Sequence, residues 1–144
     1  MRKSQGPREF AAALIMNEED ELLLLRRSPS VIRWPGKWGI AGGGLNAGES
    51  PASGLRRELR EELGRDVRIR MLRGPETLKA IGGYGGCIHL WHALWVDGNI
   101  RLSEEHTEWA WVGREVFGRL DVMPGVSQDL DHFGIWGARA DGRL

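Results

Sequence analysis

Three glutamates, Glu58, Glu61 and Glu62, lie close together in the sequence at helical spacing. In a helix, residues three and four apart share a face, so the three carboxylates would converge beside one turn. Like charges at these spacings destabilise an isolated helix by about 0.2–0.5 kcal/mol per pair. The cluster is either a solvated face, partly neutralised by Arg57 and Arg60, or a site for a hard divalent cation. A solvated face is the commoner outcome for such a run, and Mg²⁺ would suit the second interpretation, because it takes carboxylate, water and phosphate oxygens as ligands.

The residues around the glutamates predict the helix that would carry them. Pro51 suits the first helical position, and Ser50 before it is a good N-cap. Gly64 suits the position just past the helix end. Between these limits, apolar residues recur at helical spacing and form one buried stripe, made of Ala52, Leu55, Leu59 and Leu63. The sequence therefore predicts a helix over residues 51–63, entered from a stretch of three glycines at residues 42–44.

A longer pattern of fixed spacing, residues 43–65, contains this helix. Its defining residues are Gly43, Glu49, Arg57, Glu58, Glu61, Glu62 and Gly64, with the aliphatic Leu59. This pattern closely resembles the Nudix box of the Nudix hydrolase family, including its MutT-like members. Arg65 stands where the family normally has an aliphatic residue. Ala41 and Asn46 also differ from many members, and these departures concern loop conformation and substrate choice more than chemistry.

The resemblance implies hydrolysis of a nucleoside diphosphate linked to a further group, by attack of water on phosphorus with the help of divalent cations. It implies Mg²⁺ as the cofactor, with Mn²⁺ as a substitute. Glu58, Glu61 and Glu62 are the implied metal ligands, together with the backbone carbonyl of Gly42, where glycine lets the chain approach closely. Glu58 and Glu61 are also implied catalytic residues, and Arg57 would orient the glutamates through charge-assisted hydrogen bonds.

The general base is expected to be either a glutamate of the box or an acid in the later stretch at residues 103–108. The family often has an acid shortly before a tryptophan in this region, which favours Glu108 over Glu104 and Glu105. A solvated acidic turn is the alternative interpretation of this stretch.

Four further residues are expected to bind the substrate. Arg27 and Lys37 precede the glycines and are expected to contact phosphates, although arginine and lysine at a surface also serve solubility. Tyr84 is expected to stack on a base. Glu49 is expected to act beside Arg57.

Composition limits the class of protein. The chain has 144 residues, a formal net charge of zero and a single cysteine. We expect one domain, residues 1–144, with flexible ends at residues 1–8 and 137–144. Zero net charge does not favour nucleic acid as a partner, and neither a signal peptide nor a membrane-spanning run is evident. One cysteine suits a reducing compartment, so we expect a cytoplasmic protein. Seven tryptophans leave a homodimer open.

The order of predicted elements favours an α/β fold. Strands are expected before and after the central helix, with short helices at residues 115–120 and 126–133. Gly74 and Pro75 are expected to separate two strands, at residues 67–72 and 77–81. Few helices alternate with the strands, which argues against a doubly wound parallel sheet. The resemblance implies a Nudix-type α/β/α sandwich with a mixed sheet and with the box as a loop–helix–loop.

Substrate choice is the least constrained expectation. A nucleoside triphosphate is favoured, as for MutT-like pyrophosphohydrolases. Hydrolysis of a dinucleoside polyphosphate, a nucleotide sugar or ADP-ribose is the alternative within the family. Tyr84 keeps the dinucleoside option open, whereas the absence of proline at residues 80–82 weakens the ADP-ribose option. Outside enzymes, the alternatives are a non-catalytic nucleotide-binding module and an acidic helix that serves only as an interaction face.

Overall fold

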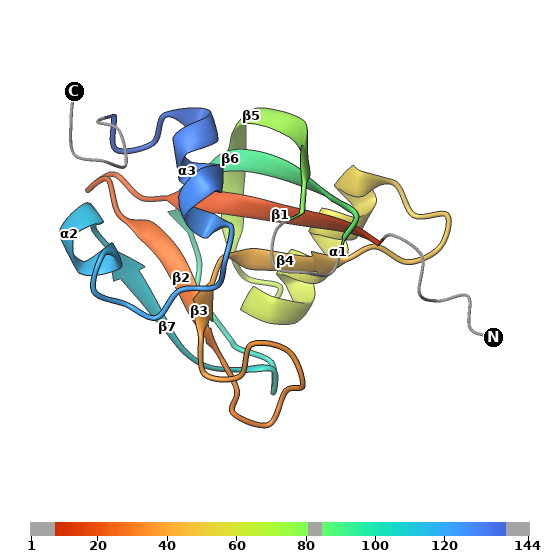
Figure 1. Cartoon of the computed structure of the whole chain (residues 1–144), viewed down its shortest axis with the longest axis horizontal. Coiled ribbons are helices and arrows are strands. Elements are labelled where there is room, and N and C mark those ends of the chain that lie inside the picture. Colours follow the sequence, from red (N-terminus) through yellow and green to blue (C-terminus); the bar gives the residue numbers. More distant parts are fainter. Residues whose placement is uncertain (1–7, 81–84, 138–144) are drawn as a thin grey trace.

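The computed structural model describes residues 8–80 and 85–137. Along the chain, the elements are β1 (Glu9–Met16), β2 (Leu22–Arg27), β3 (Trp38–Gly39), β4 (Ala41–Gly44), α1 (Pro51–Leu63), β5 (Arg68–Lys79), β6 (Cys87–Asp97), β7 (His106–Val112), α2 (Arg114–Phe117) and α3 (Val126–Phe133). Figure 1 shows their arrangement, with α3 over one face of the sheet.

The central strand of the mixed sheet is β1. One edge of β1 pairs in parallel with β6, from Glu9 opposite Cys87 to Met16 opposite Leu94, and β5 then pairs antiparallel with β6. The other edge meets β2 only at its end, where Met16 lies opposite Leu22. β2 then diverges to pair with β3 and β7, and β4 occupies the space beside β1 that β2 leaves. Beyond the Met16–Leu22 pair, β1 and β2 therefore separate from each other, and the sheet is open between them.

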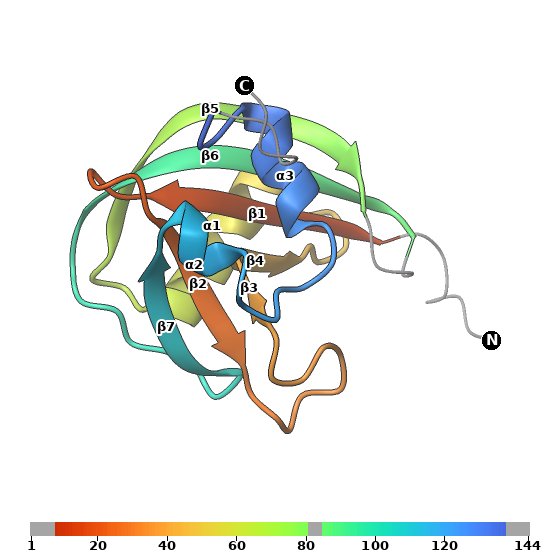
Figure 2. The ribbon, with the colours of Figure 1, turned by 60° about the vertical axis from the view of Figure 1, so that its left-hand side comes forward.

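Alternate residues of β1 face the two helices that cover the sheet. Ala11, Ala13 and Ile15 pack in one cluster with Leu55 and Leu63 of α1. The intervening residues of β1 pack in a second cluster with α3, whose members include Ala12, Leu14, Met16, Val126, Leu130 and Phe133. In Figure 2, α1 lies behind the sheet and α3 in front of it. This arrangement confirms the predicted α/β/α sandwich.

The central helix begins and ends where the sequence predicts. The Ser50 hydroxyl accepts a hydrogen bond from the Ser53 amide at 3.2 Å, and Pro51 occupies the first turn. At the other end, Gly64 has a φ of 92°, and its amide donates to the Arg60 carbonyl. Leu55 and Leu63 are fully buried. Local capping and one apolar stripe thus determine this helix.

Two local expectations are wrong. The glycines at residues 42–44, expected in a loop, belong to β4, which pairs with β1. Only glycine fits at position 42, because a Cβ at Gly42 would lie 2.5 Å from the Cα of Ala12. The predicted break at Gly74 and Pro75 is also absent, since β5 continues through both residues with shifts in register. β5 is an edge strand, where a proline without an amide donor is tolerated.

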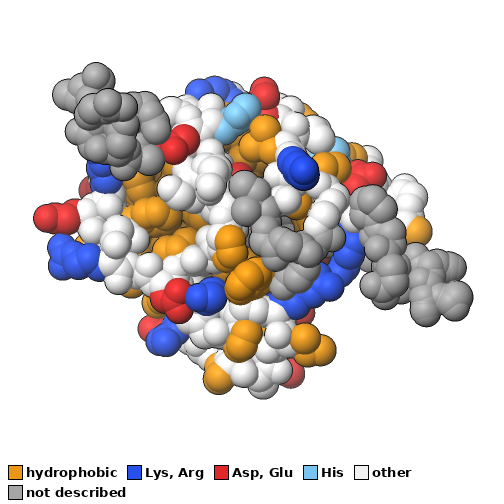
Figure 3. Space-filling view, in the orientation of Figure 1, with side chains coloured by type: hydrophobic (Ala, Val, Ile, Leu, Met, Phe, Trp, Pro, Cys, Tyr) orange, Lys and Arg blue, Asp and Glu red, His pale blue; other side chains and the backbone are white. Residues whose placement is uncertain are grey.

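The surface carries no dominant charge on the face in view. Acidic and basic side chains are both scattered across it, around exposed apolar groups (Figure 3). Among the described residues, no helix has the length and apolar character needed to cross a bilayer.

Candidate active site

Two of the three clustered glutamates lie against the glycines of β4. Glu62 is buried, with 4% of its surface exposed, and its Oε1 accepts a hydrogen bond from the Gly42 amide at 2.8 Å. Glu58 is packed on the next residue, because a Cβ at Gly43 would lie 2.5 Å from the Glu58 carboxylate. The glycines therefore serve this site by letting two carboxylates of α1 approach the backbone of β4.

These carboxylates carry a large electrostatic cost when ionised. Burial raises the pKa of Glu62 well above its usual value, the amide of Gly42 opposes that rise, and the charges of Glu58 and Glu105 add to it. Burial also raises the pKa of Glu58, against the effect of Arg57. A cation between Glu58 and Glu62 would relieve both burial and repulsion. The donors are all oxygens, a set that fits Mg²⁺ or Mn²⁺.

Arg57 ties the helix to the loop that precedes it. Its Nε and Nη2 donate to the two carboxylate oxygens of Glu49 at 2.8 and 2.9 Å, and Nη2 also donates to the Gly44 carbonyl at 3.0 Å. Its Nη1 donates to Glu58 at 3.1 Å and more weakly to Glu61 at 3.3 Å. One guanidinium thus fixes the orientation of Glu58 relative to β4, which is the positioning role expected for Arg57.

The arrangement places Glu49 behind Arg57. Hydrogen bonds from Arg57, and then from the Asn46 amide, lower the pKa of Glu49 to about 2. Both of its carboxylate oxygens accept from Arg57, and one also accepts from Asn46 at 2.8 Å. Glu49 therefore links the loop before α1 to Arg57, and its contact with substrate stays a prediction.

A cleft of about 210 Å³ begins beside Glu62 and extends to the face of the sheet that α3 covers. Arg27 lies at the end near the glutamates, where its charge lowers the pKa of Glu62 and its Nε donates to the Arg33 carbonyl at 2.7 Å. Other residues that line the cleft include Phe10, Trp34, Ile40, Lys79, His106, Met123 and Asp129. The cleft therefore places the Glu62 carboxylate and the Arg27 guanidinium in one space with apolar and aromatic side chains.

The remaining predicted site residues are Lys37, Glu108, Glu61 and Tyr84. Lys37 forms an ion pair with Asp121 at 2.7 Å. Glu108 pairs with Arg26 at 3.0 Å, and 52% of its side chain is exposed. Glu61 is exposed beside Arg57. Tyr84 lies outside the described residues.

The acidic stretch before β7 contributes a different glutamate to the electrostatics of the site. The charge of Glu105 raises the pKa of both Glu58 and Glu62. The Glu105 carbonyl accepts a hydrogen bond from the Ser28 amide at 2.8 Å, which attaches this stretch to the end of β2. Glu105 is therefore the acid of residues 103–108 for which the structure gives an electrostatic link to the clustered glutamates.

Two residues of the cleft are not among the site residues predicted from the sequence. His106 is 7% exposed, its Nδ1 has no hydrogen-bond partner among the described residues, and burial followed by the charge of Arg27 lowers its pKa to about 4. Burial raises the pKa of Asp129 to about 7, against the effect of His132. In the sequence, the one feature that distinguishes Asp129 is its place beside the apolar Leu130 in the predicted helix at residues 126–133.

Replacing Asp129 by Asn is expected to change how stability depends on pH. The pKa of Asp129 is higher in the folded protein than in the unfolded chain, so its contribution to stability is complete below about pH 4 and is lost as pH rises to about 7. The Asn variant lacks this loss, and its Tm relative to wild type should rise between those limits and level off above pH 7. Thermal melts of both proteins across this range, with Glu18→Gln in the exposed turn between β1 and β2 as a control, would measure the difference. A constant Tm difference would contradict the buried-acid assignment.

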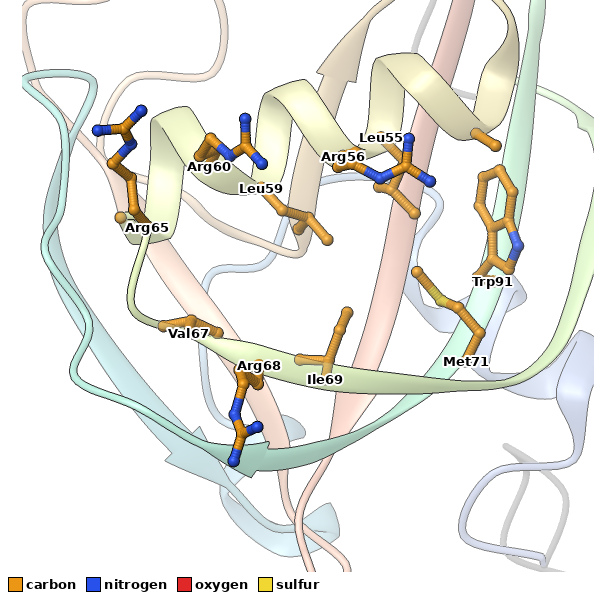
Figure 4. Close-up of a pocket in the computed structure, with 12 residues that line it drawn as sticks. Leu55, Arg56, Leu59, Arg60, Arg65, Val67, Arg68, Ile69, Met71 and Trp91 are labelled. Carbon is orange, nitrogen blue, oxygen red and sulfur yellow. The ribbon is translucent and has the colours of Figure 1, made fainter.

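A second hollow, about 490 Å³ in volume, lies between α1 and β5 on the opposite flank of the helix (Figure 4). Its floor is apolar, with Leu59, Ile69 and Trp91, and arginines that include Arg56 and Arg60 surround it. Its lining residues contain no carboxylate. The acid-lined cleft, although smaller, is therefore the candidate active site.

Comparison with known proteins supports this assignment. Residues 6–129 match the NUDIX domain. The chain is 29% identical to the nucleoside triphosphatase NudI of Enterobacter sp. (strain 638), over 89% of this chain and 97% of the relative. It is 30% identical to an RNA pyrophosphohydrolase of Gluconacetobacter diazotrophicus, over 88% and 92% of the two chains. The crystal structure of a MutT protein from Methanosarcina mazei Go1 superimposes with a TM-score of 0.69 at 29% identity, covering 88% of this chain and 92% of that one.

Nudix hydrolases are generally dependent on divalent metals, in agreement with the oxygen donors beside β4. The domain match, the relatives and the shared fold agree with the spacing of the box and with the place of its glutamates. The chain belongs to the Nudix family and is a MutT-like Nudix pyrophosphohydrolase.

Proposed function

We propose that this enzyme hydrolyses a nucleoside triphosphate to a nucleoside monophosphate and pyrophosphate with Mg²⁺. The observation that carries the proposal is the continuity of the cleft, which runs from Glu62 and Arg27 to the wall formed by Phe10, Trp34 and Met123. A volume of about 210 Å³ is below the range typical of drug-sized ligand pockets and suits one nucleoside better than two. The similarity to a nucleoside triphosphatase supports the same choice.

In this proposal, each group at the carboxylate end has a separate task. Glu58 and Glu62 would hold the cation with the Gly42 carbonyl, and Glu61 would be the outer ligand, since it is the most exposed of the three. When bound, divalent cations neutralise phosphate oxygens and lower the pKa of water. Arg27 stabilises negative charge on the phosphates, in keeping with its place beside Glu62.

Glu105 is the acid that we propose as general base in place of Glu108. The charge of Glu105 raises the pKa of Glu58 and Glu62, whereas Glu108 forms an ion pair with Arg26 on the surface. A base must reach the attacking water directly or through one further water, and a carboxylate beside the metal ligands meets this requirement best.

The aromatic lining of the cleft is suited to recognition of the base. Trp34 and Phe10 are both lining residues, and stacking of a base on an aromatic side chain is worth about 1–3 kcal/mol. Asp129 has a pKa near 7, so its carboxyl group is available there as a hydrogen-bond donor or as an acceptor. The edges of purines and pyrimidines differ in the positions of their hydrogen-bond donors and acceptors. Asp129 would therefore contribute to the choice between bases.

A substrate panel with Mg²⁺ tests the proposal. The arms are canonical and oxidised nucleoside triphosphates, a 5′-triphosphorylated RNA, ADP-ribose, nucleotide sugars and dinucleoside polyphosphates. We expect the highest kcat/KM for a nucleoside triphosphate, with pyrophosphate as a product. A tenfold higher kcat/KM on any other class would overturn the substrate assignment, and the RNA arm tests the activity named for the second relative. Binding of a nucleotide without hydrolysis of any substrate would identify a non-catalytic module.

A further inference from the structure

A second group of potential metal ligands lies on the other face of the sheet. Glu9 and Cys87 are opposite each other at the start of the parallel pairing of β1 and β6, and His89 is two residues further along β6. One donor atom from each residue lies within 4.8 Å of the other two. Phe10 and Ile88 alternate with these residues along the strands and line the cleft, so the group points away from the cleft, to the face of the sheet that α1 covers.

We propose that Glu9, Cys87 and His89 form a zinc site, with water as the fourth ligand. The donors are a carboxylate oxygen, a thiolate sulfur and an imidazole nitrogen, the set that Zn²⁺ combines in proteins. Hard Mg²⁺ takes oxygen ligands and does not favour sulfur or imidazole. The two metal sites of the chain would therefore select different ions by the chemistry of their donors.

The distances between donor atoms are close to those of a tetrahedral zinc centre. The Cys87 Sγ lies 3.8 Å from the His89 Nε2, and this nitrogen lies 2.8 Å from the Glu9 Oε1. Tetrahedral coordination at normal Zn–S, Zn–N and Zn–O bond lengths places such pairs roughly 3.6 and 3.4 Å apart. Only the exposed Glu9 needs to move by more than a few tenths of an ångström, and its side chain has the freedom to do so.

The neighbours of His89 prepare its Nε2 for a metal. The other ring nitrogen, Nδ1, lies 2.9 Å from the Thr77 hydroxyl on β5. Histidine ligands of metals usually have such a hydrogen bond on the second nitrogen, which fixes the ring and its tautomer. β6 lies between β1 and β5, so the ring is held from both sides by strands.

Without a metal, hydrogen bonds account less well for the convergence of these three side chains. Both the Glu9 carboxylate and the Cys87 thiol are directed at one nitrogen of His89, which has a single position for a hydrogen bond. Zinc would replace the thiol proton, which passes to solvent, and would satisfy all three donors at once.

Cobalt substitution tests the site separately from the active site. Co²⁺ added to the metal-free protein should give a thiolate-to-metal absorption in the near ultraviolet, and one equivalent of Zn²⁺ should remove it. Cys87→Ser should abolish this absorption, and His89→Ala should lower cobalt affinity at least tenfold. The matched control is His92→Ala on the same strand, which should leave the absorption unchanged. The Glu58→Gln/Glu62→Gln double variant should also keep it.

Alkylation of Cys87 provides a second measurement on the unmodified chain. Because this is the only cysteine, the rate of its reaction with iodoacetamide reports on the site alone. Stoichiometric Zn²⁺ should slow the reaction at least tenfold, and Mg²⁺ should not. Absence of a thiolate band at saturating Co²⁺, or equal alkylation rates with and without Zn²⁺, would overturn the proposal. Neither result depends on which substrate the enzyme hydrolyses.

Discussion

Replacement of Glu62 by Gln is expected to lower kcat/KM by about a thousandfold, and Glu58→Gln by a similar factor. A thousandfold loss corresponds to about 4 kcal/mol of transition-state stabilisation. We expect this magnitude because each substitution removes a negatively charged ligand of the proposed cation from a largely buried position, where solvent compensates poorly for the lost charge. Steady-state kinetics at saturating Mg²⁺ would measure the loss.

The fold should survive the Glu62 substitution. A glutamine oxygen can still accept the hydrogen bond from the Gly42 amide, and the side-chain volume is unchanged. The pKa of Glu62 is higher in the folded protein than in the unfolded chain, so its contribution to stability is complete at low pH and declines as pH rises. In cation-free buffer at neutral pH, the Gln variant should therefore have a Tm at or above that of wild type.

Glu18→Gln is the matched control for this experiment, since Glu18 is exposed in the turn between β1 and β2. It should change neither kcat/KM nor Tm. Glu61→Gln should have a smaller effect than the other two substitutions, because Glu61 is exposed and its contacts with Arg57 are long. Activity within threefold of wild type in both Glu58→Gln and Glu62→Gln would contradict the placement of the active site.

Removal of divalent cations is expected to abolish hydrolysis, and addition of Mg²⁺ or Mn²⁺ to restore it. The oxygen donors of Glu58, Glu62 and the Gly42 carbonyl are the proposed ligands. Without a cation, the two carboxylates repel each other and would repel a phosphate as well. Activity with excess chelator, followed by titration with each metal, would measure the dependence. Undiminished hydrolysis in chelator would reject a metal mechanism.

Thermal stability provides a measurement of the same binding that needs no substrate. A ligand that binds only the folded state stabilises it by RT ln(1 + [L]/Kd), so Tm should rise with Mg²⁺ concentration. The Glu58→Gln/Glu62→Gln double variant should lose this rise. Cys87→Ser should keep it, because Cys87 is not among the residues proposed to hold Mg²⁺ and does not line the cleft. An equal rise in wild type and in the double variant would place the cation elsewhere.

The helix and its glutamates were predictable because their determinants are local. Ser50, Pro51 and Gly64 act through the backbone of adjacent turns, and the positions of Glu58 and Glu62 on one side follow from helical geometry alone. The resemblance of residues 43–65 to the Nudix box then gave the reaction class. The prediction of an α/β/α sandwich is confirmed for the same reason, since the order of elements and the box limit the fold.

The cleft was less predictable, because distant contacts form it. The pairing of β4 with β1 depends on the absence of a side chain at Gly42, and the packing of Glu58 depends on its absence at Gly43. A sequence pattern does not separate such glycines from a loop. Lys37 is held by Asp121, 84 residues away, and Glu108 by Arg26, 82 residues away. Periodicity within one element contains no information about such partners.

The divergence of β2 from β1 has a consequence for how this enzyme can be altered. The groups proposed to hold the cation lie on β4 and α1, whereas Met123 and Asp129, which also line the cleft, belong to the segment that leads into and forms α3. Met123 follows the end of α1 by about sixty residues. Libraries confined to residues 121–129 should therefore change which nucleotide is accepted while the machinery for cleaving its phosphates stays intact, so that selectivity can evolve independently of the chemical step.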